Sequence, residues 1–152
     1  MVAASPSDLR VRRATGGDLA TVERLLVAAD LPTDDVSAGD ARFYLAFDGE
    51  TTEPAAVGGL ELAGDAALLR SVAVAEARRG EGIGTALVGA LEERAAAAGV
   101  ATLVLLTTGA AGFFAARGYD RVDRSAIPDP LGSTPQVASL CPDSAAVLRK
   151  RL

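Results

Sequence analysis

The chain has 152 residues, 49% of them apolar and 23% charged, which predicts one globular domain over residues 1–152. It contains no histidine, which excludes a Ser-His-Asp triad, an imidazole general base and a histidine-bearing zinc site, and we expect no metal. A net charge of −5 disfavours a nucleic-acid partner. The charged N-terminus and the absence of any run of about 18 apolar residues predict a cytoplasmic protein without membrane contact.

The first half of the chain changes from a strand-like segment to a helix and then to three successive strands. Turn and capping residues at Thr15–Asp18 precede the helix, and Asp48-Gly49 and Gly64-Asp65 supply the turns between the later strands. The expected elements are a strand over Leu9–Arg13, a helix with Leu19, Val22, Leu25 and Leu26 on one face, and strands over Phe43–Phe47, Ala55–Leu62 and Ala66–Val74. The sheet therefore begins antiparallel.

The second half opens with a helix, because the hydrophobic pattern becomes helical from Gly82 and Gly99 supplies a C-terminal cap. The apolar run Val100–Leu106 is typical of a strand covered on both faces, and a strand that follows a crossover helix should lie parallel to the preceding strand. The remaining expected elements are a helix over Ala110–Arg117, a strand over Tyr119–Val122, a helix after Thr134-Pro135 and a strand over Ala145–Lys150.

The most informative stretch, Leu68–Leu87, combines a strand, a turn rich in arginine and glycine, and an amphipathic helix. Gly80, Gly82 and Gly84 let the backbone present N–H groups at the start of the helix, where the helix dipole also favours a phosphate or pyrophosphate. Thr85 stands where a G-x-G-x-x-G motif needs its third glycine, and no Gly-Lys-Ser/Thr occurs, so neither of those motifs is present. We expect a ligand that bears a nucleotide; a glycine-rich turn without a ligand is the alternative.

Two segments resemble the GNAT superfamily of acyl-CoA-dependent N-acetyltransferases. The first, Arg79-Gly-Glu-Gly-Ile-Gly84, has the R/Q-x-x-G-x-G/A spacing of the family's cofactor turn. The second, Gly109–Tyr119, is similar to the signature A-x-x-F-Y-x-x-x-G-F/Y, with matches at Ala110, Phe113, Phe114, Gly118 and Tyr119. The order of elements resembles the GNAT fold over nearly the whole chain. Leu103–Thr108 and the tail Thr134–Ala145 look like the arsenic-resistance N-acetyltransferase branch.

The resemblance implies an α/β (α+β) fold, a mixed and mostly antiparallel sheet of about six to seven strands flanked by helices. The central strands diverge and hold acetyl-CoA as a cosubstrate, with pantetheine paired to exposed strand backbone. We also expect a bulge where Leu68–Val72 fails to alternate cleanly. Arg78 should help Arg79 to neutralise phosphates, and Glu81 should contribute only its N–H. The implied cofactor-binding residues are Val72, Ala73, Val74, Arg79, Gly80, Glu81, Gly82, Ile83, Gly84, Thr85, Ala110 and Phe114.

Acetyl transfer needs a neutral amine, a polarised thioester carbonyl and a proton donor for the leaving thiolate. Many relatives carry a tyrosine at the position of Phe114, which has no proton to give. The donor therefore stays open: water, Tyr44, Thr107 or Thr108 substitutes, or coenzyme A leaves unassisted. Thr107 also occupies the position of a frequent asparagine beside the cofactor, and we assign it a catalytic role. Glu61 is the candidate base, with a solvent-facing strand glutamate as the alternative.

Arg70 is the candidate anchor for the substrate, because an arginine on the cofactor strand could bind a carboxylate or other oxyanion in bidentate fashion. An exposed strand residue is the alternative. Tyr44 and Thr108 are also assigned to substrate binding. Cys141 is expected to be a partly buried structural thiol, because trivalent arsenic prefers more than one thiolate and the chain has one cysteine.

The predicted function is transfer of an acetyl group from acetyl-CoA to the amino group of a small molecule, either amino-acid-like or an arsenical, by direct attack of the amine. A catalytically degenerate acyl-CoA-binding sensor or partner module is one alternative, motivated by Phe114. Acetylation of a protein N-terminus or lysine is another. The expected partner is a small-molecule amine, and whether the chain forms a homodimer stays open.

Overall fold

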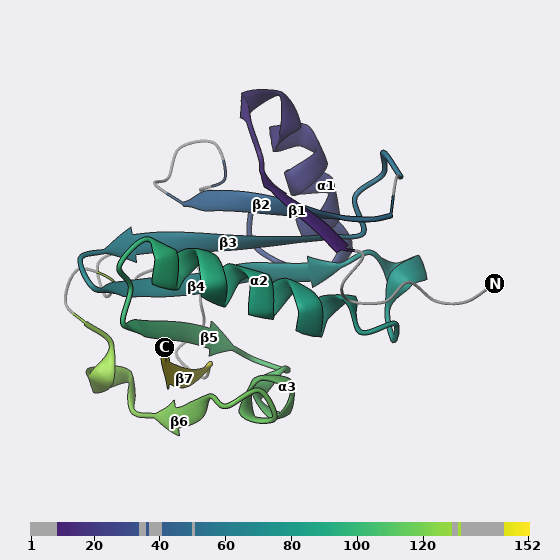
Figure 1. The fold of residues 1–152 in the computed structure, drawn as a ribbon. Coiled ribbons are helices and arrows are strands. Elements are labelled where there is room, and N and C mark those ends of the chain that lie inside the picture. The colour runs from purple at the N-terminus through teal and green to yellow at the C-terminus, as the bar shows by residue number, and fades with distance from the viewer. Residues whose placement is uncertain (1–8, 34–35, 37–40, 50, 129–130, 132–144) are drawn as a thin grey trace.

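The computed structural model describes residues 9–33, 36, 41–49, 51–128, 131 and 145–152. In this part of the chain, seven strands form one sheet in the order β1-β2-β3-β4-β5-β7-β6 (Figure 1). The strands are β1 (Leu9–Arg13), β2 (Arg42–Asp48), β3 (Ala56–Ala63), β4 (Ala66–Val74), β5 (Thr102–Thr107), β6 (Asp120–Val122) and β7 (Ala146–Arg151). The helices are α1 (Leu19–Ala28), α2 (Ile83–Ala97) and α3 (Ala111–Ala115), with short 3-10 turns η2 (Gly16–Asp18), η3 (Glu76–Arg78) and η4 (Arg124–Ala126). Among the described residues, no helix combines the length and hydropathy that a bilayer-spanning segment requires.

The central strands β4 and β5 are parallel, and the other neighbouring strands of the described sheet are antiparallel. The pairing between β4 and β5 is confined to the beginning of both strands, at Ala66↔Thr102, Ala67↔Leu103 and Leu68↔Val104. Beyond these positions both strands continue, but no further residue of β4 pairs with a residue of β5. The predicted mixed, mostly antiparallel sheet is therefore confirmed, together with its parallel strand after the crossover helix and its diverging centre.

Helices cover both faces of the sheet. On one face, α2 packs through Leu87 and Leu91 in a buried cluster that includes Tyr44 of β2; this helix lies in front of the sheet in Figure 1. On the other face, Val22 of α1 shares a second cluster with Phe43. Successive strand residues point to opposite faces, so the neighbours Phe43 and Tyr44 belong to different cores.

A β-bulge interrupts the pairing of β3 with β4. Val57 lies opposite Ala73 and Gly59 lies opposite Arg70, so β4 carries one more residue than β3 between these pairs. Ser71, inside the bulge, has a φ of 55°, a left-handed conformation that costs a non-glycine residue about 1–2 kcal/mol. The bulge predicted from the irregular alternation of this strand is confirmed.

The end of α2 shifts the start of the next strand. Gly99 has a φ of 90° and its N–H donates to Ala96 O, while the Val100 N–H donates to Ala95 O, both at 3.0 Å. These two bonds form a Schellman cap, which makes Val100 part of the helix ending. For this reason β5 begins at Thr102 and not at Val100 as predicted. Two expected features lie outside the described residues: the helix after Thr134-Pro135, and Cys141.

Candidate functional site

A cavity of about 180 Å³ opens where β4 and β5 diverge. The described residues that line it come from both strands, the end of α1 and the start of α3: Leu68–Val72, Leu105–Thr107, Ala29, Leu31, Pro32, Ala110 and Phe114. Beyond the pair Leu68↔Val104, the facing edges of the two strands are not paired with each other. An extended ligand with amide groups can pair with such edges as an added strand does.

The glycine-rich turn lies beyond the far end of β4. Gly80 and Gly82 have φ values of 83° and 81°, a left-handed conformation that glycine adopts without strain. Gly82 is the N-cap of α2, whose helical residues begin at Ile83. A Cβ on Gly84 would lie 3.5 Å from Val74 Cγ2, so the first turn of α2 packs directly on the end of β4. The turn therefore carries the orphan N–H groups and positive dipole end that favour an anion.

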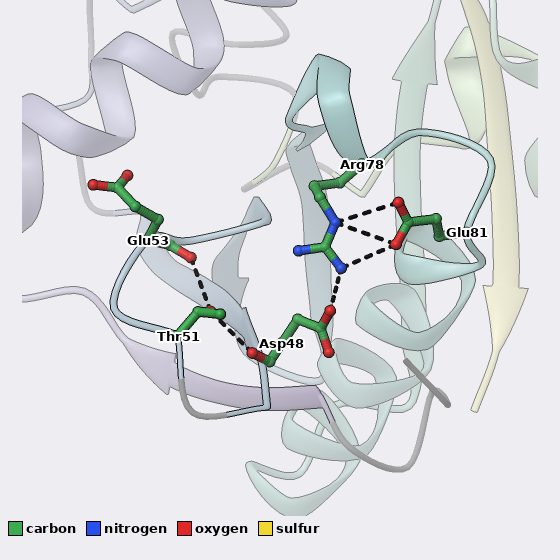
Figure 2. Close-up of polar contacts among 5 residues, drawn as sticks. All are labelled: Asp48, Thr51, Glu53, Arg78 and Glu81. Carbon is green, nitrogen blue, oxygen red and sulfur yellow. Dashed lines mark hydrogen bonds and ion pairs between the residues drawn. The ribbon is translucent and has the colours of Figure 1, made fainter. Parts of the chain in front are cut away.

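The side chain of Glu81 is held by Arg78 within this turn. Arg78 Nε donates to both Glu81 oxygens at 3.2 and 3.3 Å, and Arg78 Nη2 donates to Glu81 Oε1 at 3.0 Å and also to Asp48 Oδ2 (Figure 2). The bonds to Glu81 and then to Asp48 raise the pKa of Arg78 above its ordinary value. Thr51 Oγ1 donates to Asp48 O at 2.9 Å and Glu53 O at 3.4 Å, which braces the β2–β3 hairpin. Arg78 therefore pairs with two carboxylates in this structure and links the turn to β2, and its role on phosphates stays a prediction.

Two other arginines lie near the start of α2. Arg79 is expected at the phosphates, and its Nε donates to Val74 O at 3.2 Å. Arg117 was not predicted: its Nε and Nη2 donate to Thr85 Oγ1 at 3.0 and 2.7 Å, and its guanidinium lies 3.9 Å from the centre of the Phe113 ring. Arg117 lies two residues past the end of α3, but the spacing of four residues from Phe113, within the predicted helix over Ala110–Arg117, is a signal that could have revealed the contact.

Phe114 lines the cavity as the resemblance implies, and packs edge-on against Phe113 and Tyr119 at centroid distances of 5.0 and 5.6 Å. Tyr119 is buried, as expected of a packing residue, and its hydroxyl donates to Glu92 Oε2 at 2.8 Å. Burial and then this bond raise the pKa of Tyr119. The Tyr119 hydroxyl is therefore bound to Glu92, whose carboxylate also accepts a hydrogen bond from Lys150 Nζ at 3.0 Å.

Thr107 ends β5, and Thr108 follows it directly, but the two threonines differ in position. Thr107 lines the cavity, and its Oγ1 accepts hydrogen bonds from the N–H groups of Ala110 at 3.0 Å and Gly109 at 3.4 Å. These contacts fix the entry to α3. Thr108 is exposed and is not among the described residues that line the cavity, because it lies just past the end of the strand. Its assignment to substrate binding is not supported by this position.

Arg70 and Glu61 form a buried ion pair on the face of the sheet that α1 covers. Arg70 Nη1 lies 2.6 Å from Glu61 Oε1, and the side chains are 1% and 7% exposed. Arg70 lines the cavity, but the described lining residues do not include Glu61. Both alternatives that placed these side chains in solvent are therefore wrong. Glu61, the candidate base, therefore binds Arg70, the candidate anchor, from the side away from the cavity.

Tyr44 lies away from the cavity, which corrects its assignment to substrate binding and its candidacy as the proton donor. Its ring belongs to the core beneath α2, and the guanidinium of Arg94 lies 5.1 Å from the ring centre. The residue that faces the cavity side of β2 is its neighbour Phe43, whose ring lies 5.4 Å from Arg70 Cζ. The alternation of β2 decides between the two aromatic residues.

Solved structures of several acetyltransferases have the same fold. N-acetylglutamate synthase from Neisseria gonorrhoeae, complexed with coenzyme A and N-acetyl-glutamate, has a TM-score of 0.78 at 18% identity over 95% of this chain and 35% of that chain. Rv2747 from Mycobacterium tuberculosis, in complex with CoA, has a TM-score of 0.74 at 19% identity over 94% and 99%. The IAA acetyltransferase from Bacillus cereus has 0.68 at 19% identity over 95% and 99%.

Family membership comes from a sequence model. The chain spans about a third of the length of the N. gonorrhoeae enzyme, and no curated protein matches it. The model of the acetyltransferase (GNAT) family matches residues 16–119, which run from the turn before α1 through α3 and include the cavity strands and the glycine-rich turn. The chain belongs to the GNAT acetyltransferase family.

Proposed function

We propose that this chain transfers an acetyl group from acetyl-CoA to the amino group of a small molecule. The main observation in support is that β4 connects the cavity to the glycine-rich turn. Its residues Leu68–Val72 line the cavity, and its end at Val74 contacts the first turn of α2. A cofactor laid along this strand has its pyrophosphate at Gly80–Thr85, its pantetheine beside the backbone of Val72–Val74 and its thioester in the cavity.

The proposed chemistry is direct attack of the amine on the thioester. The amine nitrogen bonds to the carbonyl carbon and loses a proton to water, the carbon–sulfur bond breaks, and coenzyme A leaves as a thiolate that takes up a proton from water. Phe114 supplies a wall to the cavity and no proton. The hydroxyl of Thr107, whose oxygen already accepts two backbone N–H groups, is the proposed hydrogen-bond donor toward the thioester oxygen or the leaving thiolate.

A small acceptor agrees with the size of the cavity and with the relatives. At about 180 Å³, the space admits a compact amine beside the acetyl group. One similar structure holds N-acetyl-glutamate and another is named as an IAA acetyltransferase. Amino-acid-like amines are the leading acceptors, and an arsenic-containing amino acid belongs in the test panel because of the resemblance to the arsenic-resistance branch.

The test is calorimetric titration of the purified full chain with acetyl-CoA, followed by thiol release with a broad panel of primary amines. Gly82→Glu adds a carboxylate and a strained left-handed side chain at the N-cap of α2, and we expect it to abolish detectable binding. Gly64→Glu is the matched control. Gly64 also has a positive φ, of 64°, and open space around it, but lies in the β3–β4 turn at the opposite end of β4.

Each outcome separates the alternatives. Absence of both acetyl-CoA binding and thiol release overturns the proposal. Binding without turnover on any amine supports the degenerate sensor instead. Preference for peptide N-termini or lysines over small amines supports a protein acetyltransferase.

A further inference from the structure

A cationic corner beside the glycine-rich turn has no part in the acetyl transfer described above. It consists of the guanidinium of Arg117, the ring of Phe113 and the hydroxyl of Thr85. The chain has 20 acidic residues against 15 basic ones, yet in the part of it that the structure describes no carboxylate forms an ion pair with Arg117. Neither the first turn of α2 nor α3 contains an acidic residue. Arg117 therefore carries a positive charge that no described carboxylate neutralises.

The guanidinium of Arg117 is oriented by several contacts. Its Nε and Nη2 donate to Thr85 Oγ1 at 3.0 and 2.7 Å, its Nη1 donates to Phe113 O at 2.6 Å, and its Cζ lies 3.9 Å from the centre of the Phe113 ring. The backbone is held as well, because Lys150 Nζ donates to Arg117 O at 2.9 Å. These bonds leave the second N–H groups of Nη1 and Nη2 for a ligand. A planar cation that is already oriented loses little rotamer entropy when it binds one.

Thr85 joins this corner to the glycine-rich turn. The first hydrogen bond within α2 runs from the Ala86 N–H to Gly82 O at 3.1 Å, so the N–H of Thr85 precedes the bonded part of the helix. Because Thr85 Oγ1 accepts two hydrogen bonds from Arg117, its own proton is left to donate to another acceptor. A Cβ on Gly84 would lie 3.5 Å from Phe113 Cζ, so the ring packs against the same turn.

Acetyl-CoA carries a phosphate besides its pyrophosphate, a monoester on the 3′ oxygen of the ribose. Such a monoester has a charge of about −1.5 to −2 at pH 7, and a guanidinium binds it through two parallel hydrogen bonds. In the proposed function the pyrophosphate lies at the N–H groups of Gly80–Thr85. The ribose follows directly on the pyrophosphate, so its phosphate needs a partner beside this turn, where Arg117 lies.

We propose that Arg117 binds the 3′-phosphate of the cofactor and makes the chain selective for coenzyme A over carriers that lack this phosphate. Thr85 is a positioning residue for Arg117, since its oxygen accepts two of the guanidinium bonds. This inference rests on the cofactor binding in the proposed function and adds a specificity residue to it. Dephospho-CoA has the same pantetheine and pyrophosphate without the 3′-phosphate, and it is the probe that isolates the contact.

Calorimetric titration of the purified full chain with coenzyme A and with dephospho-CoA provides the first test. We expect wild type to bind coenzyme A about 10- to 100-fold more tightly, as a hydrogen-bonded charge contact predicts. In Arg117→Met, which keeps an apolar stem but no charge, this ratio of Kd values should fall to below about 3. The Kd for dephospho-CoA should stay within about fivefold of wild type, because this ligand never meets the guanidinium through a 3′-phosphate.

Two further variants control for charge and for geometry. Arg13→Met removes the same charge from an exposed residue of β1 at the edge of the sheet, and it should keep the wild-type ratio. Arg117→Lys keeps the charge but loses the planar fork, and its ratio should lie between those of wild type and Arg117→Met. If Arg117→Met does not fold, Thr85→Val decides: it removes the oxygen that orients Arg117, and the ratio should fall by about fivefold.

The outcomes separate this inference from the proposed function. A wild-type ratio near one overturns the inference alone. Equal weakening of both ligands in Arg117→Met also overturns it, because Arg117 would then contact the pyrophosphate or only tie the end of α3 to α2. An unchanged ratio in Thr85→Val overturns the positioning role. Absence of binding of either ligand overturns both proposals, whereas a clear preference for coenzyme A without turnover on any amine leaves the inference standing and overturns the proposed function.

Discussion

Two arginine–carboxylate clusters, one in β4 and one just beyond its end, show how far the surroundings decide what a charge does. The side chains of Arg70 and Glu61 are 1% and 7% exposed, whereas those of Arg78, Asp48 and Glu81 are between 16% and 29% exposed. Water screens the outer cluster, and the inner cluster is screened much less. An arginine–carboxylate contact should therefore affect the stability of the fold strongly in the inner cluster and weakly in the outer cluster.

The clusters also differ in what they join. Glu61 and Arg70 belong to two strands of one hairpin, so their ion pair shapes the wall of a cavity that the strands already build. Asp48 and Arg78 are 30 residues apart, and their contact ties the end of β2 to the turn that precedes α2. The inner cluster therefore fixes Arg70 in the wall of the cavity, and the outer cluster ties the glycine-rich turn to β2.

The largest expected effect is on the inner cluster. Glu61→Ala removes the carboxylate that lies 2.6 Å from the buried guanidinium of Arg70, and we expect the free energy of unfolding to fall by about 3–5 kcal/mol. Urea unfolding of the variant beside the double variant Glu61→Leu with Arg70→Met measures this, since the double variant removes both charges and should be close to wild type. A decrease in the free energy of unfolding of less than about 1 kcal/mol would mean that water screens the inner pair as it screens the outer cluster, and would contradict the difference between them.

A smaller effect is expected from Asp48→Asn in the outer cluster. The free energy of unfolding should fall by less than about 1 kcal/mol, and the difference should shrink as salt is added. Because Arg78 then loses one of its two anchors, KM for acetyl-CoA should rise by up to about fivefold with kcat unchanged. Asp120→Asn on β6 is the control. A loss as large as that of Glu61→Ala would contradict the weak coupling.

The smallest effect is expected for the pair of Arg12 and Asp18, whose side chains are 50% and 19% exposed. The hydrogen bond from Arg12, followed by that from the Thr15 N–H, holds the pKa of Asp18 well below its ordinary value. A lowered folded-state pKa contributes stability above the unfolded pKa of about 4, and this contribution is lost as pH falls toward the folded value. Unfolding midpoints of wild type and Asp18→Asn should therefore differ slightly at pH 7 and converge in acid. A difference that grows on acidification would contradict this sign.

Much of the fold could be predicted because its signals are local. The glycines at 80 and 82, the change of period at α2 and the alternation of the strands depend on neighbouring residues, and the predicted mixed sheet is confirmed. The misplaced residues depend on tertiary geometry. Tyr44 and Phe43 are adjacent aromatic residues, and only the packing of α1 and α2 decides which face of the sheet each of them covers. One of the two partners of Arg78, Asp48, lies 30 residues away, beyond any local pattern.

By itself, the sequence determined the family of the chain, the turn before α2 and the fact that Phe114 has no hydroxyl to donate a proton. Each of these depends on residue identity and short spacing. Only the tertiary structure decided that Glu61 lies behind Arg70, that Arg78 pairs with Asp48 and Glu81, and that Arg117 reaches Thr85. The physical reason is that an ion pair requires charged ends to lie within a few ångströms, and strand register, a one-residue bulge and helix docking set those distances.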